Sequence, residues 1–167
     1  MPSKSPHLNC QTARTMGIEV DDLSRPAVHA LLREHLAHMH RLSPPEQVFA
    51  LDLSKLKASD ITFWTAWDGE LLLGCGALKE LTPRNGEIKS MRTPANLRGR
   101  GAGRAMLEHI VDAARQRGYE LLSLETGTHP EFSAAHQLYK SAGFQVSGPF
   151  ADYEVDPHSM CMELRLA

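Results

Sequence analysis

The sequence lacks a long hydrophobic run and a strong excess of either charge. Its 167 residues contain no apolar stretch near the roughly 20 that a transmembrane helix needs, and the first residues lack the apolar core of a secretory signal. A formal net charge of -2 argues against the broadly basic surface of a nucleic-acid-binding protein. We therefore expect a single cytoplasmic domain with neither a membrane nor a nucleic acid as partner.

Cysteine is scarce, and the spacing of cysteine and histidine does not favour a metal centre. Cys10, Cys75 and Cys161 form no C-x-x-C pair, and an odd number of cysteines is typical of free thiols in a reducing compartment. The pattern H-x-x-H-x-H at 35–40 does not put its three imidazoles on one face of a helix. The sequence therefore predicts no bound metal.

Two common phosphate-binding motifs are also missing, although a glycine-rich run is present. No Gly-Lys-Ser or Gly-Lys-Thr occurs, which excludes a P-loop. The run RGRGAG at 98–103 is followed by Arg104, where the dinucleotide fingerprint G-x-G-x-x-G needs its last glycine. The spacing that does fit is R-x-x-G-x-G, read as Arg98, Gly101 and Gly103.

This run has the properties of an anion-binding loop. Its glycines permit positive φ and close approach, so several backbone N–H groups can point at one pyrophosphate. Periodic apolar positions predict that a helix follows and ends before Gly118, which brings the positive end of its dipole to the loop. The helix stripe comprises Leu107, Ile110, Val111 and Ala114. The simpler alternative is a glycine loop that only turns the chain.

The remaining sequence alternates between strand and helix signals after a flexible leader at 1–16. Alternating or apolar runs predict strands at 18–23, 60–67, 70–81, 87–93, 119–127, 143–150 and 159–166. Helices are predicted to begin at Ser24-Pro26, at the capping box Ser43–Glu46, after the glycine run and at Pro130. Asp68-Gly69 and Asn85-Gly86 predict turns. The resulting order, β-α-α-β-β-β-α-β-α-β-β, is an α/β fold over 17–167.

This order and two motifs resemble the GCN5-related N-acetyltransferases, the GNAT superfamily. R-x-x-G-x-G is similar to the acyl-CoA signature of that superfamily, and AAHQLYKSAGF at 134–144 looks like its A-x-x-L-Y-x-x-x-G-F segment. The amino-acid sequences of several other segments are similar to those of an uncharacterised bacterial branch of this superfamily. The chain departs from the pattern at Phe132, where many members have Asn, so a cofactor contact from an Asn side chain is absent.

The resemblance implies a mixed central sheet flanked by helices and an acyltransferase reaction. In that reaction an acetyl group passes from acetyl-CoA directly to a primary amine of a small molecule or peptide. Backbone groups at the end of the 87–93 strand would bind the thioester and pantetheine, and the glycine run would bind the pyrophosphate. The implied cofactor site is Met91, Arg92, Thr93, Arg98, Gly99, Arg100, Gly101, Ala102, Gly103 and Arg104.

Tyr139 is implied as the acid that protonates the leaving thiolate, because a phenol stays protonated at neutral pH. The general base is open between two carboxylates. Glu87 stands where the histone-acetylating branch has its base, and Glu125 ends an apolar segment where a charge is costly unless it faces a cleft or a partner. Both could instead be salt-bridged strand ends, with water as the base. Such carboxylates would favour a cationic amine as acceptor.

In the resembling folds, the first two helices and their connection line the acceptor site. We therefore expect acceptor contacts from His38, Met39, Glu46 and the 150–158 hairpin. A different class of function, an acyl-CoA sensor without turnover, is the alternative to an enzyme. Retention of Tyr139 and both glutamates favours turnover. The sequence leaves a homodimer open and does not identify the acceptor.

Overall fold

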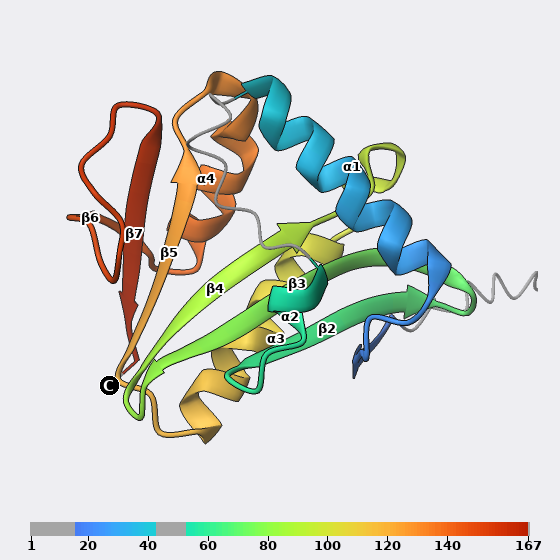
Figure 1. The fold of residues 1–167 in the computed structure, drawn as a ribbon, viewed down its shortest axis with the longest axis horizontal. Helices are drawn as coiled ribbons and strands as arrows, with labels where there is room; N and C mark the ends of the chain where they lie inside the picture. Colours follow the sequence, from blue (N-terminus) through green and yellow to red (C-terminus); the bar gives the residue numbers. More distant parts are fainter. Residues whose placement is uncertain (1–15, 43–52, 167) are drawn as a thin grey trace, which may run out of the picture.

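The protein is built around one seven-stranded sheet. The computed structural model describes residues 16–42 and 53–166. The strands are β1 (Gly17–Val20), β2 (Ile61–Asp68), β3 (Leu71–Thr82), β4 (Asn85–Arg92), β5 (Leu121–Gly127), β6 (Gln145–Ser147) and β7 (Ser159–Arg165). Their order in the sheet is β1-β2-β3-β4-β5-β7-β6, in which β4 and β5 are parallel and the other neighbours are antiparallel (Figure 1).

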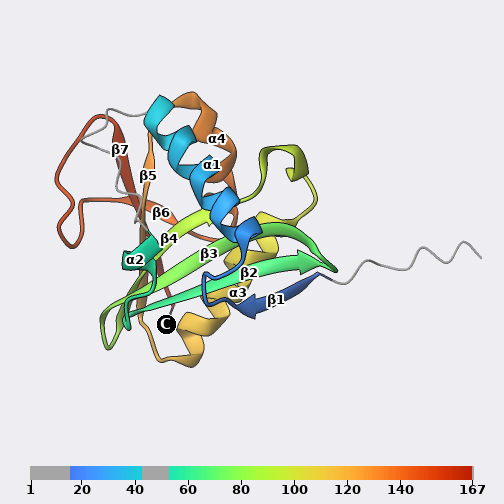
Figure 2. The same ribbon diagram turned by 45° about the vertical axis from the view of Figure 1, so that its right-hand side comes forward.

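Helices cover both faces of this sheet, so the molecule has three layers. On one face lie α1 (Pro26–Leu42) and α2 (Leu53–Leu56), and on the other lie α3 (Ala102–Gln116) and α4 (Ser133–Ser141) (Figures 1 and 2). Two single turns of 3-10 helix, η2 (Ala95–Leu97) and η3 (Pro130–Phe132), precede α3 and α4 respectively. None of the helices in the described ranges is long and apolar enough to cross a membrane.

Each face of the sheet has its own hydrophobic core. Val28 and Leu31 of α1 pack with Phe63 of β2 on the first face. On the second face, the stripe of α3 packs against β3, where a Cβ on Gly76 would come within 2.9 Å of Ile110. Glycine at position 76 therefore lets α3 lie close to the sheet. Full burial of a side chain such as Ile110 contributes roughly 1.5–3 kcal/mol.

The predicted fold class and element order are confirmed. The sequence of strands and helices is the expected β-α-α-β-β-β-α-β-α-β-β. The four predicted stripe residues of α3 are buried, and Gly118 follows the helix with a left-handed φ of 78°. Gly69, at the predicted β2–β3 turn, also has a positive φ, 59°. Local signals were sufficient at these points because the turn residues set the backbone directly.

One predicted turn is wrong, because Asn85 and Gly86 lie inside β4. The chain turns at 83–84 instead, where the hydroxyl of Thr82 accepts hydrogen bonds from the backbone N–H groups of Arg84 and Asn85. A Cβ on Gly86 would come within 2.8 Å of the Tyr119 ring. This glycine therefore serves a packing contact with a residue distant in sequence rather than a turn.

Several predicted elements are shorter than expected. The segment from Pro130 begins as η3 and becomes α-helical only at Ser133, and the strand predicted at 143–150 is limited to β6. The capping box at Ser43–Glu46 lies outside the described residues, and α2 is the part of the predicted second helix that the structure describes.

Candidate active site

The neighbouring strands β4 and β5 pair over only part of their length. Parallel pairing runs from Asn85–Leu121 to Ile88–Leu124 and goes no further, although β4 continues to Arg92 and β5 to Gly127. The far half of β4 therefore has no strand beside it on its β5 side within the described structure. This opening provides the space in which the candidate site is built.

A bulge in β4 reshapes the backbone at this opening. The register with β3 passes from Lys89–Ala77 to Arg92–Cys75, so Ser90 and Met91 have no paired residues of their own. Ser90 has a positive φ of 55°, which is uncommon for a residue with a side chain. The Cys75 thiol donates a hydrogen bond to the Ser90 carbonyl over 3.3 Å. Backbone groups of β4 are thus available beside the opening.

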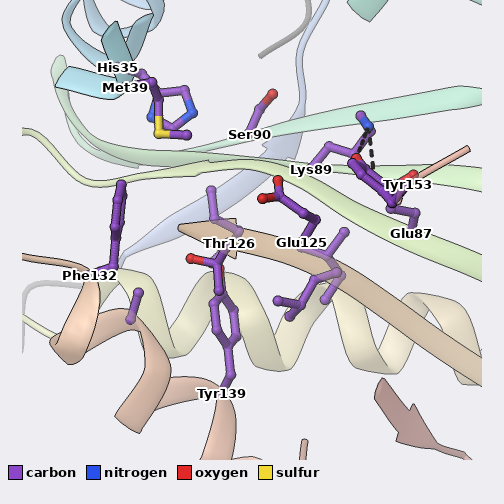
Figure 3. A pocket seen from close by; sticks show the side chains of 14 residues that line it. His35, Met39, Glu87, Lys89, Ser90, Glu125, Thr126, Phe132, Tyr139 and Tyr153 are labelled. Atoms are coloured by element: carbon purple, nitrogen blue, oxygen red, sulfur yellow. Dashed lines mark hydrogen bonds and ion pairs between the residues drawn. The ribbon is translucent and has the colours of Figure 1, made fainter. Parts of the chain in front are cut away.

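Two hollows meet at this place. The first, which we call the β4–β5 cavity, has a volume of about 110 Å³ (Figure 3). Its lining is His35, Met39, Glu87, Ile88, Lys89, Ser90, Met91, Leu124, Glu125, Thr126, Phe132, Ala135, Tyr139 and Tyr153.

The second hollow, the glycine cleft, has a volume of about 420 Å³ and runs along the start of α3. Its lining includes all ten residues of the predicted cofactor site, from Met91 to Arg104. The two hollows share five lining residues, namely His35, Met91, Phe132, Ala135 and Tyr139. The cleft and the cavity therefore adjoin at Met91 and Tyr139.

The backbone of the glycine cleft is arranged for an anion. Gly99 and Gly101 are left-handed, with φ of 80° and 84°, and a Cβ on either would meet nothing within 4 Å. Gly101 is the N-cap of α3, and no side chain caps that end of the helix. Open space, uncapped N–H groups and the positive end of the α3 dipole coincide here, which suits a phosphate.

Three arginines line the same cleft, and they differ in whether their side chains are hydrogen-bonded. Arg98 and Arg100 are exposed, and Arg104 donates to the Ser141 hydroxyl over 3.3 Å. These exposed guanidinium groups can pair with phosphate oxygens through charge-assisted hydrogen bonds. The cleft therefore combines backbone donors with movable cations.

Arg92 lines the cleft too, but its guanidinium is held by α1. Nη1 donates to Nδ1 of His38 over 3.0 Å, and Nη2 donates to Glu34 over 3.0 Å. Glu34 also accepts from the backbone N–H of Ala95, and although burial opposes this, the two hydrogen bonds lower the pKa of Glu34. The network fixes the end of β4 and the following loop to α1.

The His38 imidazole completes this network. Burial lowers the pKa of His38, so the ring is neutral at physiological pH. Because arginine can only donate, Nδ1 of His38 must accept from Arg92 and the proton belongs on Nε2. Nε2 lies 3.3 Å from a carboxylate oxygen of Glu131 on η3, to which it donates. His38 therefore joins α1, β4 and η3.

Tyr139 stands between the cavity and the cleft. It is the buried residue of α4, its ring packs edge-on against Phe144, and its hydroxyl end points up into the cavity in Figure 3. Burial first, and then the charge of Glu125, raise the pKa of Tyr139 to about 12. The phenol is therefore protonated across the physiological range. This is the state that a proton donor requires.

Glu87 lines the cavity but has its charge matched there. It is 3% exposed, and its carboxylate accepts from the Tyr153 hydroxyl over 2.6 Å and from the Lys89 ammonium over 2.9 Å. Lys89 also donates to the Tyr153 hydroxyl, so the three groups form one set of contacts, drawn as dashed lines in Figure 3. Tyr153 is not predictable as the partner of Glu87 from spacing, because the two residues are 66 positions apart.

Glu125 has a different environment on the opposite strand. One carboxylate oxygen accepts from the Ser159 hydroxyl over 2.8 Å. Burial raises the pKa of Glu125, and the nearby charges of Glu87 and Asp156 act in the same direction, against Lys89 and the Ser159 hydrogen bond. A carboxylate whose pKa is raised is a stronger base than an exposed one. Glu125 is thus the less neutralised of the two predicted carboxylates.

The residues expected to contact the acceptor differ in their position relative to the two hollows. Met39 and Tyr153 line the β4–β5 cavity, whereas His38 lines only the glycine cleft. Glu154 and His158 are exposed and lie outside the cavity lining, and Glu46 is outside the described residues. The described ranges contain no group of three or more potential ligands that could hold a metal.

His35 is a lining residue whose role the sequence did not indicate. It follows Leu31 by four positions and precedes His38 by three, so it continues the buried stripe of α1 into both hollows. An imidazole on an apolar helix stripe was the available signal. The H-x-x-H-x-H spacing by itself bears only on metal binding.

Comparison with known proteins gives a consistent relationship. The model of the acetyltransferase (GNAT) family matches residues 26–144. An uncharacterized N-acetyltransferase of Bacillus subtilis is 52% identical over 151 residues, which cover 90% of this chain and all of the relative. A second uncharacterized N-acetyltransferase, from Escherichia coli, is 50% identical over 89% of this chain and 94% of its own. A protein of Azospirillum brasilense named IAA acetyltransferase is 39% identical, covering 82% and 89%.

Solved structures agree with these relatives. A Klebsiella pneumoniae protein described as an acyl-CoA N-acyltransferase has a TM-score of 0.78 and 29% identity, covering 92% of this chain and 99% of its own. A Salmonella typhimurium acetyltransferase, solved with acetyl-CoA, shares the fold with a TM-score of 0.68 at 18% identity, covering 91% and 94%. Because of its fold, the matching family model and relatives that align over most of its length, the chain belongs to the GNAT family of acetyltransferases.

Proposed function

We propose that this acetyltransferase moves an acetyl group from acetyl-CoA directly to a primary amine of a small molecule or peptide. The observation that carries the proposal is the junction of the glycine cleft with the β4–β5 cavity at Met91 and Tyr139. A phosphate-binding loop, a free strand backbone and a protonated phenol then lie along one path. We also propose a cytoplasmic setting, which the buried free thiols of Cys75 and Cys161 support.

The donor fits the glycine cleft by its charge and shape. The N–H groups at the start of α3 and the backbone at Gly99 and Gly101 hold the pyrophosphate, and the arginines Arg98, Arg100 and Arg104 offset its charge. The pantetheine extends along the free side of β4, where its amides pair with backbone groups at 91–93 as a strand would. Acetyl-CoA supplies the activated acetyl group when bound.

A backbone N–H and the Tyr139 phenol have separate roles at the thioester. A backbone N–H beside the bulge at Ser90 and Met91 donates to the thioester oxygen as negative charge develops there, a contribution of roughly 3 kcal/mol in comparable sites. The new C–N bond forms as the C–S bond breaks. Tyr139 gives its proton to the leaving thiolate, which lies in the same desolvated place and is more basic there for the same reason that the phenol is.

The amine loses its proton to a carboxylate of the cavity. We propose Glu125, directly or through water, because Glu87 is already matched by Lys89 and Tyr153. That pairing also weakens the preference for a cationic acceptor that two free carboxylates would create, since the Lys89 charge offsets one of them. A neutral primary amine, or one that loses its proton on entry, is therefore the proposed acceptor.

An acceptor screen that follows release of free CoA thiol tests this proposal. Primary amines of small molecules and peptides form the main arm, and hydroxyl compounds and IAA form a second arm because of the named relative. We expect thiol release with at least one primary amine and formation of its acetyl amide. Tight binding of acetyl-CoA with no release for any compound would instead support the sensor. Activity on the second arm alone would overturn the amine acceptor.

A further inference from the structure

The β4–β5 cavity contains a polar atom with no partner. Nδ1 of His35 is buried and makes no hydrogen bond in the described structure. The ring comes from α1 and lies across the cavity from the hydroxyl end of Tyr139 (Figure 3). Because His35 also lines the glycine cleft, its imidazole stands at the junction where the acetyl group and the acceptor nitrogen must meet.

Most of the polar groups around His35 are paired, although Nε of Arg92 is also buried without a partner. His38 is bonded to Arg92 and Glu131, and Glu34 is bonded to Arg92 and Ala95. A buried nitrogen without a partner costs free energy, and native proteins satisfy the great majority of such groups. The missing partner of His35 is therefore best explained as a ligand that enters the cavity.

The charge state of His35 limits what that ligand offers. Burial first, then the positive charge of Arg92 and the nearby His38, lower the pKa of His35 to about 4, against a smaller opposite effect of Glu34. The ring is neutral at physiological pH, and a neutral imidazole has one nitrogen that accepts a hydrogen bond. An imidazole of such low basicity does not take a proton from an ammonium group, but it can accept a hydrogen bond from an N–H.

We propose that Nδ1 of His35 accepts a hydrogen bond from the acceptor amine, on the N–H that remains in the product amide. The inference rests on the proposed function. A neutral primary amine has two N–H groups and one lone pair. The lone pair attacks the acetyl carbon, one proton leaves to the base, and the other N–H stays and points at His35.

This contact makes His35 a specificity residue as well. A secondary amine or an alcohol has a single hydrogen on the attacking atom, and that hydrogen leaves during the reaction. Neither can supply the retained N–H, so Nδ1 of His35 stays unpaired in the transition state. Sites built to bond a substrate N–H discriminate strongly against analogues that lack it. His35 therefore selects primary amines over their N-methyl analogues.

The test compares His35→Leu, His35→Asn and wild type on an accepted primary amine and on its N-methyl analogue. We expect His35→Leu to lower kcat/KM for the primary amine about tenfold or more, and to lower the ratio between the two amines by a similar factor. Asn keeps an oxygen near the position of Nδ1, so His35→Asn should restore much of both. His40→Leu, on the exposed side of the same helix, should change neither.

Two further readouts separate this contact from a structural role. Affinity for acetyl-CoA should stay within about twofold in His35→Leu, and its Tm should be equal to or above that of wild type, because Leu removes an unpaired buried polar atom. Unchanged kinetics, an equal loss for both amines with a lower Tm, or a loss that follows acetyl-CoA affinity would each overturn the inference. If wild type acetylates no amine, the proposed function fails and this inference with it.

Discussion

The glycine cleft and the β4–β5 cavity adjoin, but they are built in opposite ways. The anion site of the cleft comes from one segment, 98–104, in which the backbone of Gly99, Gly101 and the start of α3 lies beside three arginines of the same segment. The cavity collects side chains from α1, β4, β5, α4 and the loop before β7, and its two carboxylates, Glu87 and Glu125, accept hydrogen bonds from side chains of other segments. The groups that would bind the anion therefore come from one segment, whereas the groups of the cavity are brought together from several elements.

If this division is correct, a change at the junction should affect turnover without affecting donor binding. Tyr139→Phe removes one hydroxyl and keeps the ring that packs on Phe144. We expect kcat to fall by about 10² or more, as for the loss of a general acid, while acetyl-CoA affinity by calorimetry stays nearly unchanged. Wild-type turnover, with chemistry shown to be rate-limiting, would remove Tyr139 from the reaction.

A change in the loop should do the opposite. Gly101→Val puts a branched side chain in open space beside the α3 N-terminus and at a φ of 84°. We expect the Kd for acetyl-CoA to rise roughly 10- to 100-fold, because the donors of the helix end can no longer approach the pyrophosphate.

Gly118→Val is the matched control for that change. Gly118 has a similar φ of 78° and equally open surroundings, but it lies at the other end of α3. Both variants should lose about 1 kcal/mol or more of stability, since a positive φ disfavours a side chain. Only Gly101→Val should weaken acetyl-CoA binding. Equal losses of affinity in the two variants would mean that strain, rather than the cleft, explains the effect.

Within the cavity, the two carboxylates should behave differently. Because the pKa of Glu125 is raised, kcat/KM should increase with pH as Glu125 loses its proton. Glu125→Gln should flatten this limb and lower the rate by about tenfold or more. Glu87→Gln should preserve the limb and mainly lower stability, because it leaves the Lys89 charge without its carboxylate.

The pH dependence of the acceptor is the control for this pair. A limb that moves with the pKa of the amine in all three proteins belongs to the acceptor itself. A limb lost in Glu87→Gln but kept in Glu125→Gln would reverse the assignment of the base.

The smallest expected effect separates the arginines of the cleft. Arg92→Met removes the partner of His38 and Glu34, and we expect a loss of about 1–3 kcal/mol, or roughly 3–10 °C in Tm. Arg100→Met should leave Tm unchanged and weaken acetyl-CoA binding, because Arg100 is exposed and faces the cleft. Calorimetry measures both. A Tm in Arg92→Met equal to wild type would show that this network does not stabilise the fold.

The same division explains what the sequence could predict. The glycine run, the α3 stripe and Gly118 determine the local backbone over a few residues, so they were recognisable from spacing alone. All ten residues expected at the cofactor site line one cleft. The functional roles of these residues remain predictions. The fold class followed because the order of strands and helices was readable from local patterns and matched a known family.

Long-range contacts account for what the sequence missed. The Asn85-Gly86 pair predicts a turn, whereas Gly86 lies in β4 against the ring of Tyr119. The sequence leaves Glu87 open between a general base and a salt-bridged strand end, and its spacing does not indicate the hydrogen bond from Tyr153 in a distant loop. The position of His35 on the apolar stripe of α1 is readable from the sequence, but its place in the β4–β5 cavity depends on other elements. Side chains that converge from several elements are not predictable from spacing along one.

A bisubstrate analogue tests most directly whether the two regions form one site. In this compound, an accepted primary amine is joined through an acetyl linker to the sulfur of CoA, and its Kd is compared with that of CoA by calorimetry. Because the cleft and the cavity adjoin at Met91 and Tyr139, the account predicts a Kd at least about 100-fold lower than for CoA. Equal affinity for the analogue and CoA would contradict it, since the amine would then gain nothing from the cavity.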